Sequence, residues 1–316
     1  MLSVVLATCN GEKYLAAQLK SLEEQTLLPE ELVVFDDCSV DGTVSVLREF
    51  AKNAPFAAEI HENLSPLGAA QNFAAALAAA KGDYIAFCDQ DDVWQKDKLR
   101  LAMEVMQKTE TAAKGEPVAV HTDLTVVDEN LQTVQHSLHK SQLLPQNANL
   151  TNILAQNPAV GCTMLINKPL KKLMLPMPKE AVMHDFWAAV LAAAAGKLVY
   201  VDTPMVLYRQ HGKNCIGAAR YFSFSSALRL FYAEKNFVVI GAHALQTAAL
   251  VKRLRENKLV VDCAEECLSA LTKSDILKLM KLGYGKRGKL RNFFYYACLY
   301  LRREEIAEEL NDFMNG

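Results

Sequence analysis

The chain has 316 residues, of which 51% are hydrophobic, and its formal net charge is −2. This length and composition are sufficient for one large domain with an appendage. The near-neutral charge excludes a globally basic nucleic-acid-binding protein, so we expect no nucleic-acid partner.

The sequence also limits where the protein can act. The N-terminus MLSVVLATCN lacks the basic segment of a secretory signal, and no apolar run approaches the roughly 18–20 residues that span a bilayer. None of the eight cysteines has C-x-x-C spacing, and we expect reduced, mostly buried thiols. These features predict a cytoplasmic protein.

Predicted strands and helices alternate over the first 100 residues. The strands are expected at residues 3–7, 31–35, 57–61 and 84–88. The helices between them are expected at residues 12–24, 43–50 and 69–80. Short linkers with Gly or Pro separate these elements. The alternation is typical of an α/β fold with a mostly parallel central sheet that helices cover on both faces.

The alternation weakens after residue 100. Two short strands, possible partners of each other, are expected at residues 118–121 and 124–127, and a loop region at 132–149. Further strands are expected at 163–166, 197–201 and 206–209, with a helix at 183–195. From about residue 221 the pattern predicts helices only. The change of pattern divides the chain into a region of strands and helices over residues 1–215, with a break near residue 100, and a C-terminal helical region over 216–316.

An acidic cluster follows the strand predicted at residues 84–88, in the stretch YIAFCDQDDVW. Asp89 and Asp91 are one residue apart, so on an extended chain they face the same side and can share one cation. Their oxygen ligands suit Mg²⁺ or Mn²⁺, which would compensate the repulsion between the carboxylates. A solvated acidic turn is the alternative.

A second acid, Asp36, ends the strand predicted at residues 31–35. Ligands of parallel sheets bind beyond the carboxyl ends of the strands, where an acid often accepts hydrogen bonds from a ribose or base. A turn or helix-capping role is the alternative for Asp36. The chain has no G-x-G-x-x-G and no G-K-[ST] motif. A metal beside a nucleotide pocket suggests a diphosphate ligand. Without a glycine-rich phosphate-binding loop, the metal ion would have to bind that diphosphate.

Three motifs in order resemble the family 2 glycosyltransferases. They are SVVLATCNGEKYLAAQLKSLEEQT, LVVFDDCSVDGT and NLSPLGAAQNFAAALAAAKGDYIAFCDQDD. The resemblance covers roughly residues 1–215 and implies an inverting hexosyltransferase with the nucleotide-sugar-binding fold called GT-A. It implies a catalytic domain over 1–215, with a nucleotide-binding half over 1–100 and an acceptor-binding half over 101–215. DQDDVW, HDFW and YRQHG look most like bacterial rhamnosyltransferase-type members, which build surface polysaccharides.

The resemblance implies a role for each matching residue. Thr8 matches a position near the nucleotide base, and Asp36 matches the acid that contacts the base or ribose. Asp91 matches the direct metal ligand of the D-x-D pair, with Asp89 nearer the ribose or the metal-bound waters. Asp185 in MHDFW matches the catalytic base, and a plain N-terminal helix carboxylate is its alternative.

The same resemblance gives His211 of YRQHG a place at the metal or diphosphate, whereas its spacing alone fits a surface histidine equally well. Two positions depart from the family pattern. Gln71 stands where many members have an arginine, so a charged contact to phosphate is not expected there. His184 replaces the glutamate that is common before the base.

The implied donor is a dTDP- or UDP-sugar, and the implied acceptor is a saccharide or a lipid-linked saccharide. Over 278–303, basic residues flank aromatic and aliphatic ones, which suits peripheral contact with an anionic membrane at its inner face. An amphipathic helix docked on the catalytic domain explains the same pattern.

Two other functions compete with glycosyl transfer. DQDDV is similar to the D-x-D-x-[TV] motif of haloacid-dehalogenase-like phosphatases, in which Asp89 would be phosphorylated. That motif normally follows the first core strand, whereas here it follows a series of strands and helices. The second alternative is a non-catalytic sugar-nucleotide-binding module of the same fold, against which the presence of Asp185 argues.

Overall fold

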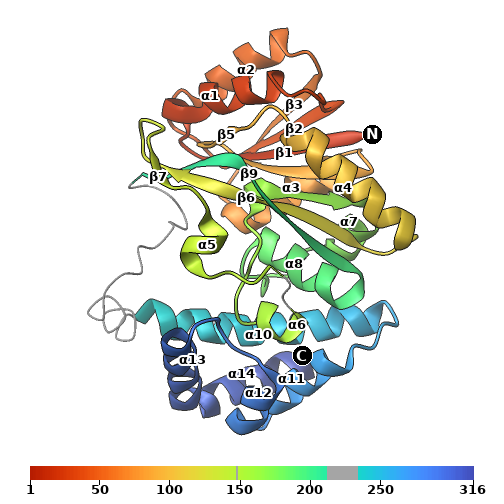
Figure 1. Cartoon of the computed structure of the whole chain (residues 1–316), viewed down its shortest axis with the longest axis vertical. Coiled ribbons are helices and arrows are strands. Elements are labelled where there is room, and N and C mark those ends of the chain that lie inside the picture. Colours follow the sequence, from red (N-terminus) through yellow and green to blue (C-terminus); the bar gives the residue numbers. More distant parts are fainter. Residues whose placement is uncertain (147–148, 212–233) are drawn as a thin grey trace.

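The computed structural model describes residues 1–146, 149–211 and 234–316 (Figure 1). The strands are β1 (Leu2–Thr8), β2 (Glu31–Asp36), β3 (Ala57–Glu62), β4 (Tyr84–Asp89), β5 (Val93–Trp94), β6 (Val118–Val127), β7 (Thr133–Gln135), β8 (Met164–Asn167) and β9 (Lys197–Arg209). The helices before β9 are α1 (Glu12–Glu23), α2 (Thr43–Asn53), α3 (Ala69–Ala79), α4 (Lys98–Ala112), α5 (Leu138–Gln142), α6 (Leu150–Ile153), α7 (Lys168–Met174) and α8 (His184–Ala195). The helices after β9 are α10 (Glu234–Glu256), α11 (Asp262–Thr272), α12 (Ile276–Leu282), α13 (Lys289–Leu301) and α14 (Arg303–Asn315).

One mixed sheet runs through the catalytic part of the chain in the order β3-β2-β1-β4-β8-β6-β9-β5, with β7 beside β6. The first four strands are mutually parallel, as are β6 and β9, whereas β8 is antiparallel to both of its neighbours. The predicted α/β class with a largely parallel sheet is confirmed.

Each face of the sheet has its own apolar layer, because successive side chains of a strand alternate between the faces. On one face, Leu6 packs with side chains from α1, α2 and α4. On the other face, Val5 packs with α3, α7 and α8, and the C-terminal helices extend the same layer. Figure 1 shows α10 between the sheet domain and the remaining C-terminal helices.

The sequence-based boundaries in the first 100 residues agree with the structure to within a few residues, but the prediction of four short strands farther on was wrong. Residues 118–121 and 124–127 belong to the single strand β6, and 197–201 and 206–209 belong to β9. Asp123 is paired with Pro204 where the register of the two strands shifts. The polar interruptions thus face each other in a bulge, so both strands continue past them.

Six further strands and α-helices of the described residues were not predicted, namely β5, α4, β7, α5, α6 and α7. The helix α4 follows the acidic turn, and the region expected to be a loop contains β7 and α5. The proposed domain boundary at residues 215/216 lies outside the described residues.

The C-terminal helices are joined to the catalytic part of the chain by specific polar contacts. The guanidinium of Arg253 in α10 donates to the carbonyl oxygens of Leu173, Leu175 and Pro176 at 2.7, 3.2 and 2.6 Å. The buried Gln246 accepts the amide of Val182 at 2.8 Å. These contacts hold both ends of the segment that leads into α8. No described helix has both the length and the hydropathy needed to cross a bilayer.

Replacing Leu6 with alanine tests the apolar layer. Leu6 is fully buried in β1, at the centre of the parallel strands, so Leu6→Ala should lower the free energy of unfolding by about 2–5 kcal/mol. Urea denaturation followed by circular dichroism measures the change. Leu64→Ala is the matched control, because the Leu64 side chain is fully exposed and its truncation should cost little. Equal losses for the two variants would contradict the assignment of the core.

Candidate active site

The carboxyl ends of β1 and β2 bring Thr8 and Asp36 together. These residues are register partners in the parallel pair, and the Thr8 hydroxyl donates to Asp36 at 2.7 Å. Asp36 also accepts the amide and hydroxyl of Ser39 at 2.8 and 2.6 Å. The turn after β2 therefore fixes the Asp36 carboxylate, which also explains the turn role considered from the sequence.

The neighbouring Asp37 organises the start of α3. Its carboxylate accepts the amides of Leu67 and Gly68 at 2.7 and 2.9 Å. Gly68 has a φ of 77°, a left-handed conformation that favours glycine. In the first turn of α3, Asn72 donates to the carbonyl oxygen of Phe35 at 2.8 Å. Asn72 thus ties α3 to the end of β2, a structural role that its sequence position did not reveal.

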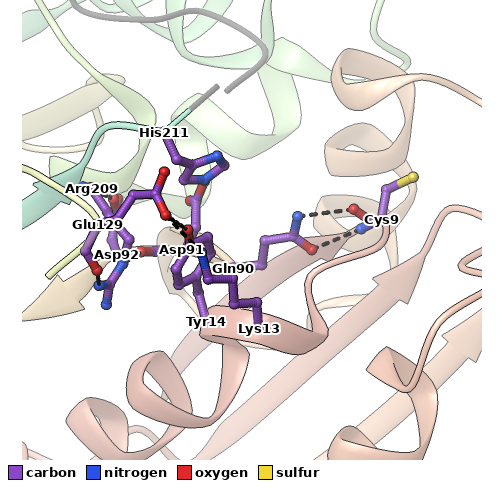
Figure 2. Close-up of polar contacts among 9 residues, drawn as sticks. All are labelled: Cys9, Lys13, Tyr14, Gln90, Asp91, Asp92, Glu129, Arg209 and His211. Carbon is purple, nitrogen blue, oxygen red and sulfur yellow. Dashed lines mark hydrogen bonds and ion pairs between the residues drawn. The ribbon is translucent and has the colours of Figure 1, made fainter. Parts of the chain in front are cut away.

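The acidic turn after β4 is tied to the loop after β1 (Figure 2). The Gln90 amide group exchanges two hydrogen bonds with the backbone of Cys9, at 2.9 and 3.0 Å. A Cβ on Gly11 would lie 2.2 Å from the Gln90 side-chain oxygen, so a larger residue there would displace the Gln90 amide group from Cys9. Gln90 therefore has a positioning role, and the carboxylates on either side of it form the chemically distinctive part of the turn.

His211 lies directly against the D-x-D pair. Its Nε2 is 2.8 Å from a carboxylate oxygen of Asp91, and the two side chains are only 10% and 14% exposed. The Tyr14 ring stacks on the imidazole, with a centroid separation of 4.8 Å. The structure thus brings together two of the predicted metal ligands, which are 120 residues apart in the chain.

Arg209 is a site residue that the sequence reasoning missed. Its Nε donates to the carbonyl oxygen of Asp91 at 2.8 Å, and its Nη1 donates to that of Glu129 at 2.6 Å. Its backbone amide donates to Asp92 at 3.1 Å, and its guanidinium lies over the Tyr14 ring (Figure 2). Arg209 fixes the acidic turn relative to β9. A cation at the start of the YRQHG motif was the available signal.

Mutual repulsion and burial perturb the carboxylates of the turn. Burial raises the pKa of Asp89 to about 8, with further contributions from the charges of Asp91 and Asp185. Burial followed by the same kind of repulsion raises the pKa of Asp92 well above its ordinary value. A divalent cation would relieve this unfavourable concentration of negative charge.

Two sets of donor atoms at this turn fit a metal ion. The first is the pair Asp91 and His211; among the described residues, Asp89 does not form a three-residue group with them. The second consists of Asp89, Asp92 and Cys162, whose donor atoms lie within 4.8 Å of one another. Burial raises the pKa of the Cys162 thiol well above its usual range, which disfavours the thiolate needed for ligation. The first set therefore suits Mg²⁺ or Mn²⁺ better.

Asp185 lies in the first turn of α8, close enough to the acidic turn for its charge to raise the pKa of Asp89. Its carboxylate accepts the amides of Gly161 and Phe186 at 2.9 and 2.5 Å. Burial nevertheless raises the pKa of Asp185 to about 6, and the hydrogen bonds oppose this shift. Such a carboxylate is oriented by its neighbours and ionised at neutral pH, as a general base must be.

The two departures from the family pattern have clear structural settings. Gln71 donates to the carbonyl oxygen of Pro178 at 3.4 Å, so it links α3 to the segment between α7 and α8. His184 is buried and stacks on Phe73 at 3.7 Å, and burial lowers its pKa to about 3. His184 is therefore neutral and supports the start of α8 from within the core.

The family model described as glycosyl transferase family 2 matches residues 3–173. Among curated relatives, dTDP-rhamnosyl transferase RfbG of Shigella flexneri is 28% identical over 67% of this chain and 74% of its own length. The putative teichuronic acid biosynthesis glycosyltransferase TuaG of Bacillus subtilis is 26% identical over 60% of this chain and 72% of its own.

Solved structures share the fold at low sequence identity. TarS of S. aureus in complex with UDP-GlcNAc is 17% identical with a TM-score of 0.54, over 98% of this chain and 91% of that one. The mannosyltransferase PcManGT of Pyrobaculum calidifontis, in complex with GDP-Man and Mn²⁺, is also 17% identical with a TM-score of 0.54, over 99% and 79%. The expected GT-A fold is confirmed, and the chain is a glycosyltransferase that belongs to family 2.

Proposed function

We propose that the protein transfers a sugar from a nucleoside diphosphate to a saccharide hydroxyl, with inversion, during synthesis of a bacterial surface polysaccharide. The observation that carries this proposal is the placement of Asp185, an oriented carboxylate with a pKa of about 6, within electrostatic reach of the D-x-D turn. A base and a diphosphate-binding turn are the two parts that an in-line displacement at an anomeric carbon requires.

In the proposed reaction, Asp185 accepts the proton of the acceptor hydroxyl as its oxygen attacks the anomeric carbon. The nucleoside diphosphate leaves from the opposite face of the sugar, which inverts the configuration. Thr8 and Asp36 are proposed to contact the base and ribose, because their linked side chains close the ends of β1 and β2. Asp89 is proposed to lie between the ribose and the metal.

Asp91, Asp89 and His211 are proposed to hold Mn²⁺ or Mg²⁺. The cation would stabilise the negative charge that grows on the departing diphosphate. A mixed carboxylate and imidazole set favours Mn²⁺ over Mg²⁺. Arg209 holds Asp91 in place by donating to the Asp91 backbone carbonyl. The positive charge of the Arg209 guanidinium therefore lies beside the proposed metal site.

The donor and acceptor are proposed from the relatives. RfbG is described as a dTDP-rhamnosyl transferase, which supports dTDP-rhamnose as the donor to test first. The TarS and PcManGT complexes contain UDP-GlcNAc and GDP-Man, so a UDP-sugar is the next candidate. The proposed acceptor is a saccharide or a lipid-linked saccharide, reached from the cytoplasm. Family membership gives no support to the phosphatase or non-catalytic alternatives.

The proposed organisation has residues 1–215 as the catalytic domain, with a nucleotide-binding half over 1–100 and an acceptor-binding half over 101–215. The proposed C-terminal helical region covers residues 216–316, of which the structure describes 234–316. The contacts of Arg253 and Gln246 with the segment before α8 support an additional role for this region in positioning the base.

Replacing the proposed base gives the most direct test. Asp185→Asn should reduce kcat about 10²–10⁴-fold while nucleotide affinity stays within a few fold, since the amide cannot accept the proton. Turnover with dTDP-rhamnose and a panel of UDP-sugars, together with calorimetric titration of dTDP and UDP, measures both quantities.

Asp262→Asn is the matched control for this variant, because Asp262 also lies in the first turn of a helix, α11. Its turnover should remain near that of the wild type. Similar small losses for the two variants would mean that Asp185 only stabilises its helix terminus.

The pH dependence of turnover follows from the raised pKa of Asp185. A base must be ionised, so kcat should fall about tenfold per pH unit below a midpoint near pH 6 and level off above it. Steady-state rates from pH 4.5 to 8.5 give the profile. An acid limb near pH 4, typical of an unperturbed aspartate, would contradict the assignment.

Metal binding can be measured without turnover. Mn²⁺ should increase the thermal stabilisation that dTDP or UDP gives, and EDTA should remove that increase together with transfer. Asp91→Asn and His211→Ala should each raise the Mn²⁺ concentration at half-effect by about tenfold or more.

His136→Ala is the control for the metal-site variants, since His136 is exposed and lies outside the described contacts of Asp91. It should leave the Mn²⁺ response unchanged. Undiminished transfer in the presence of chelator would refute the metal site. It would not affect the Asp185→Asn test, which concerns the base alone.

A further inference from the structure

The helix α13 is apolar on two opposite sides. Its inner side contributes the buried Tyr295, Cys298 and Leu299 to the core. The outer side carries Leu290, Phe293, Tyr300 and Leu301, which are 46%, 66%, 56% and 61% exposed. The inner side explains why the helix docks on the protein, and nothing in that docking requires the outer apolar side chains.

The preceding helix adds to the same exposed set. Leu277 and Met280 of α12 are 71% and 51% exposed. The Ser274 hydroxyl, just before α12, donates to the carbonyl oxygen of Arg303, just after α13, at 3.0 Å. The two helices therefore form a closed antiparallel hairpin, in which Leu277 and Tyr300 lie near the same end. Single exposed apolar residues are ordinary, but a concentration of them marks an interaction surface.

Basic side chains border these apolar residues. Lys278, Lys281, Arg287 and Lys289 have no salt bridge within the described ranges 1–146, 149–211 and 234–316. Of the acids after the hairpin, Glu305 and Glu309 pair with Arg302 and Glu304 pairs with Arg303, whereas the exposed Glu308 of α14 has no salt bridge in the described ranges. The hairpin therefore presents uncompensated positive charge beside exposed aliphatic and aromatic groups.

This chemistry matches the surface of an anionic membrane. Apolar side chains can enter the boundary between head groups and acyl chains, while lysine and arginine reach the phosphates. A second copy of the chain fits less well, because a two-fold symmetric contact would place the uncompensated basic residues against one another. We propose that the α12–α13 hairpin docks the protein on a bilayer containing anionic phospholipids.

The hairpin is rigidly fixed to the catalytic part of the chain. Arg291 donates to the carbonyl oxygen of Gln142 at the end of α5 at 2.7 Å. The backbone amide of Arg287 donates to Gln156 at 2.9 Å, and Gln156 immediately precedes Asn157, which hydrogen-bonds the Asp185 carboxylate. In Figure 1, α13 lies on the same side of the molecule as the carboxyl ends of the parallel strands. Docking would therefore hold the reactive edge at a fixed orientation to the membrane.

Vesicle flotation with the full chain tests the proposal. The wild type should float with phosphatidylglycerol–phosphatidylcholine vesicles and bind pure phosphatidylcholine much more weakly, and raising the salt concentration should release it. The double variant Leu290→Ser/Phe293→Ser should lower the partition coefficient about tenfold or more. Lys281→Gln/Lys289→Gln should lower it about fivefold for each charge removed.

Val260→Ser is the control, since Val260 is 75% exposed but lies before α11, outside the hairpin. It should bind vesicles like the wild type. The melting temperature and the nucleotide-induced thermal shift should be the same for every variant, which separates this proposal from the proposed transfer reaction. Equal partitioning of the wild type and the double serine variant would overturn the proposal. A dimer in sedimentation velocity that the same substitutions dissociate would assign the surface to a second copy and also overturn it.

Discussion

The concentration of negative charge at the end of β4 is the constraint on which the site depends. Asp89, Asp91 and Asp92 follow a buried strand, and Asp185 adds a fourth carboxylate from α8. This arrangement is unfavourable for the isolated protein, as the raised pKa of Asp89 indicates. A divalent cation would relieve this repulsion, and in the proposed reaction it would also stabilise the charge on the leaving diphosphate.

The surrounding structure holds the acidic turn in place against that repulsion mainly through hydrogen bonds to backbone groups. Gln90 fastens the turn to the loop after β1, and Arg209 fastens it to β9, in each case through backbone groups. Arg253 and Gln246 act in the same way on the segment before Asp185. The main chain around Asp89 and Asp91 is thus held from several directions, and His211 contacts the Asp91 carboxylate.

The sequence predicted what depends on local pattern. Apolar runs located β1 to β4, and three acids in four residues located the acidic turn that follows β4. The role of Arg209 was not predicted, because its hydrogen-bond partners are 80 and 118 residues away in the chain. The continuity of β6 and of β9 was not predicted either. The polar residues that interrupt each strand are accommodated only because the two strands pair through a bulge at that point. Pairing of this kind is a property of two distant segments, and neither segment alone contains it.

The shared apolar layer has a consequence for how the chain loses its structure. Phe87 of the sheet, Trp187 of α8, and Leu250 and Leu310 of the C-terminal helices belong to one contiguous cluster. Melting the helices would expose the inner face of α8, and melting α8 would expose the helices. The sheet domain and the C-terminal helices should therefore denature together. A recombinant fragment ending near residue 215 would expose the apolar surface that these helices cover, and it would tend to aggregate.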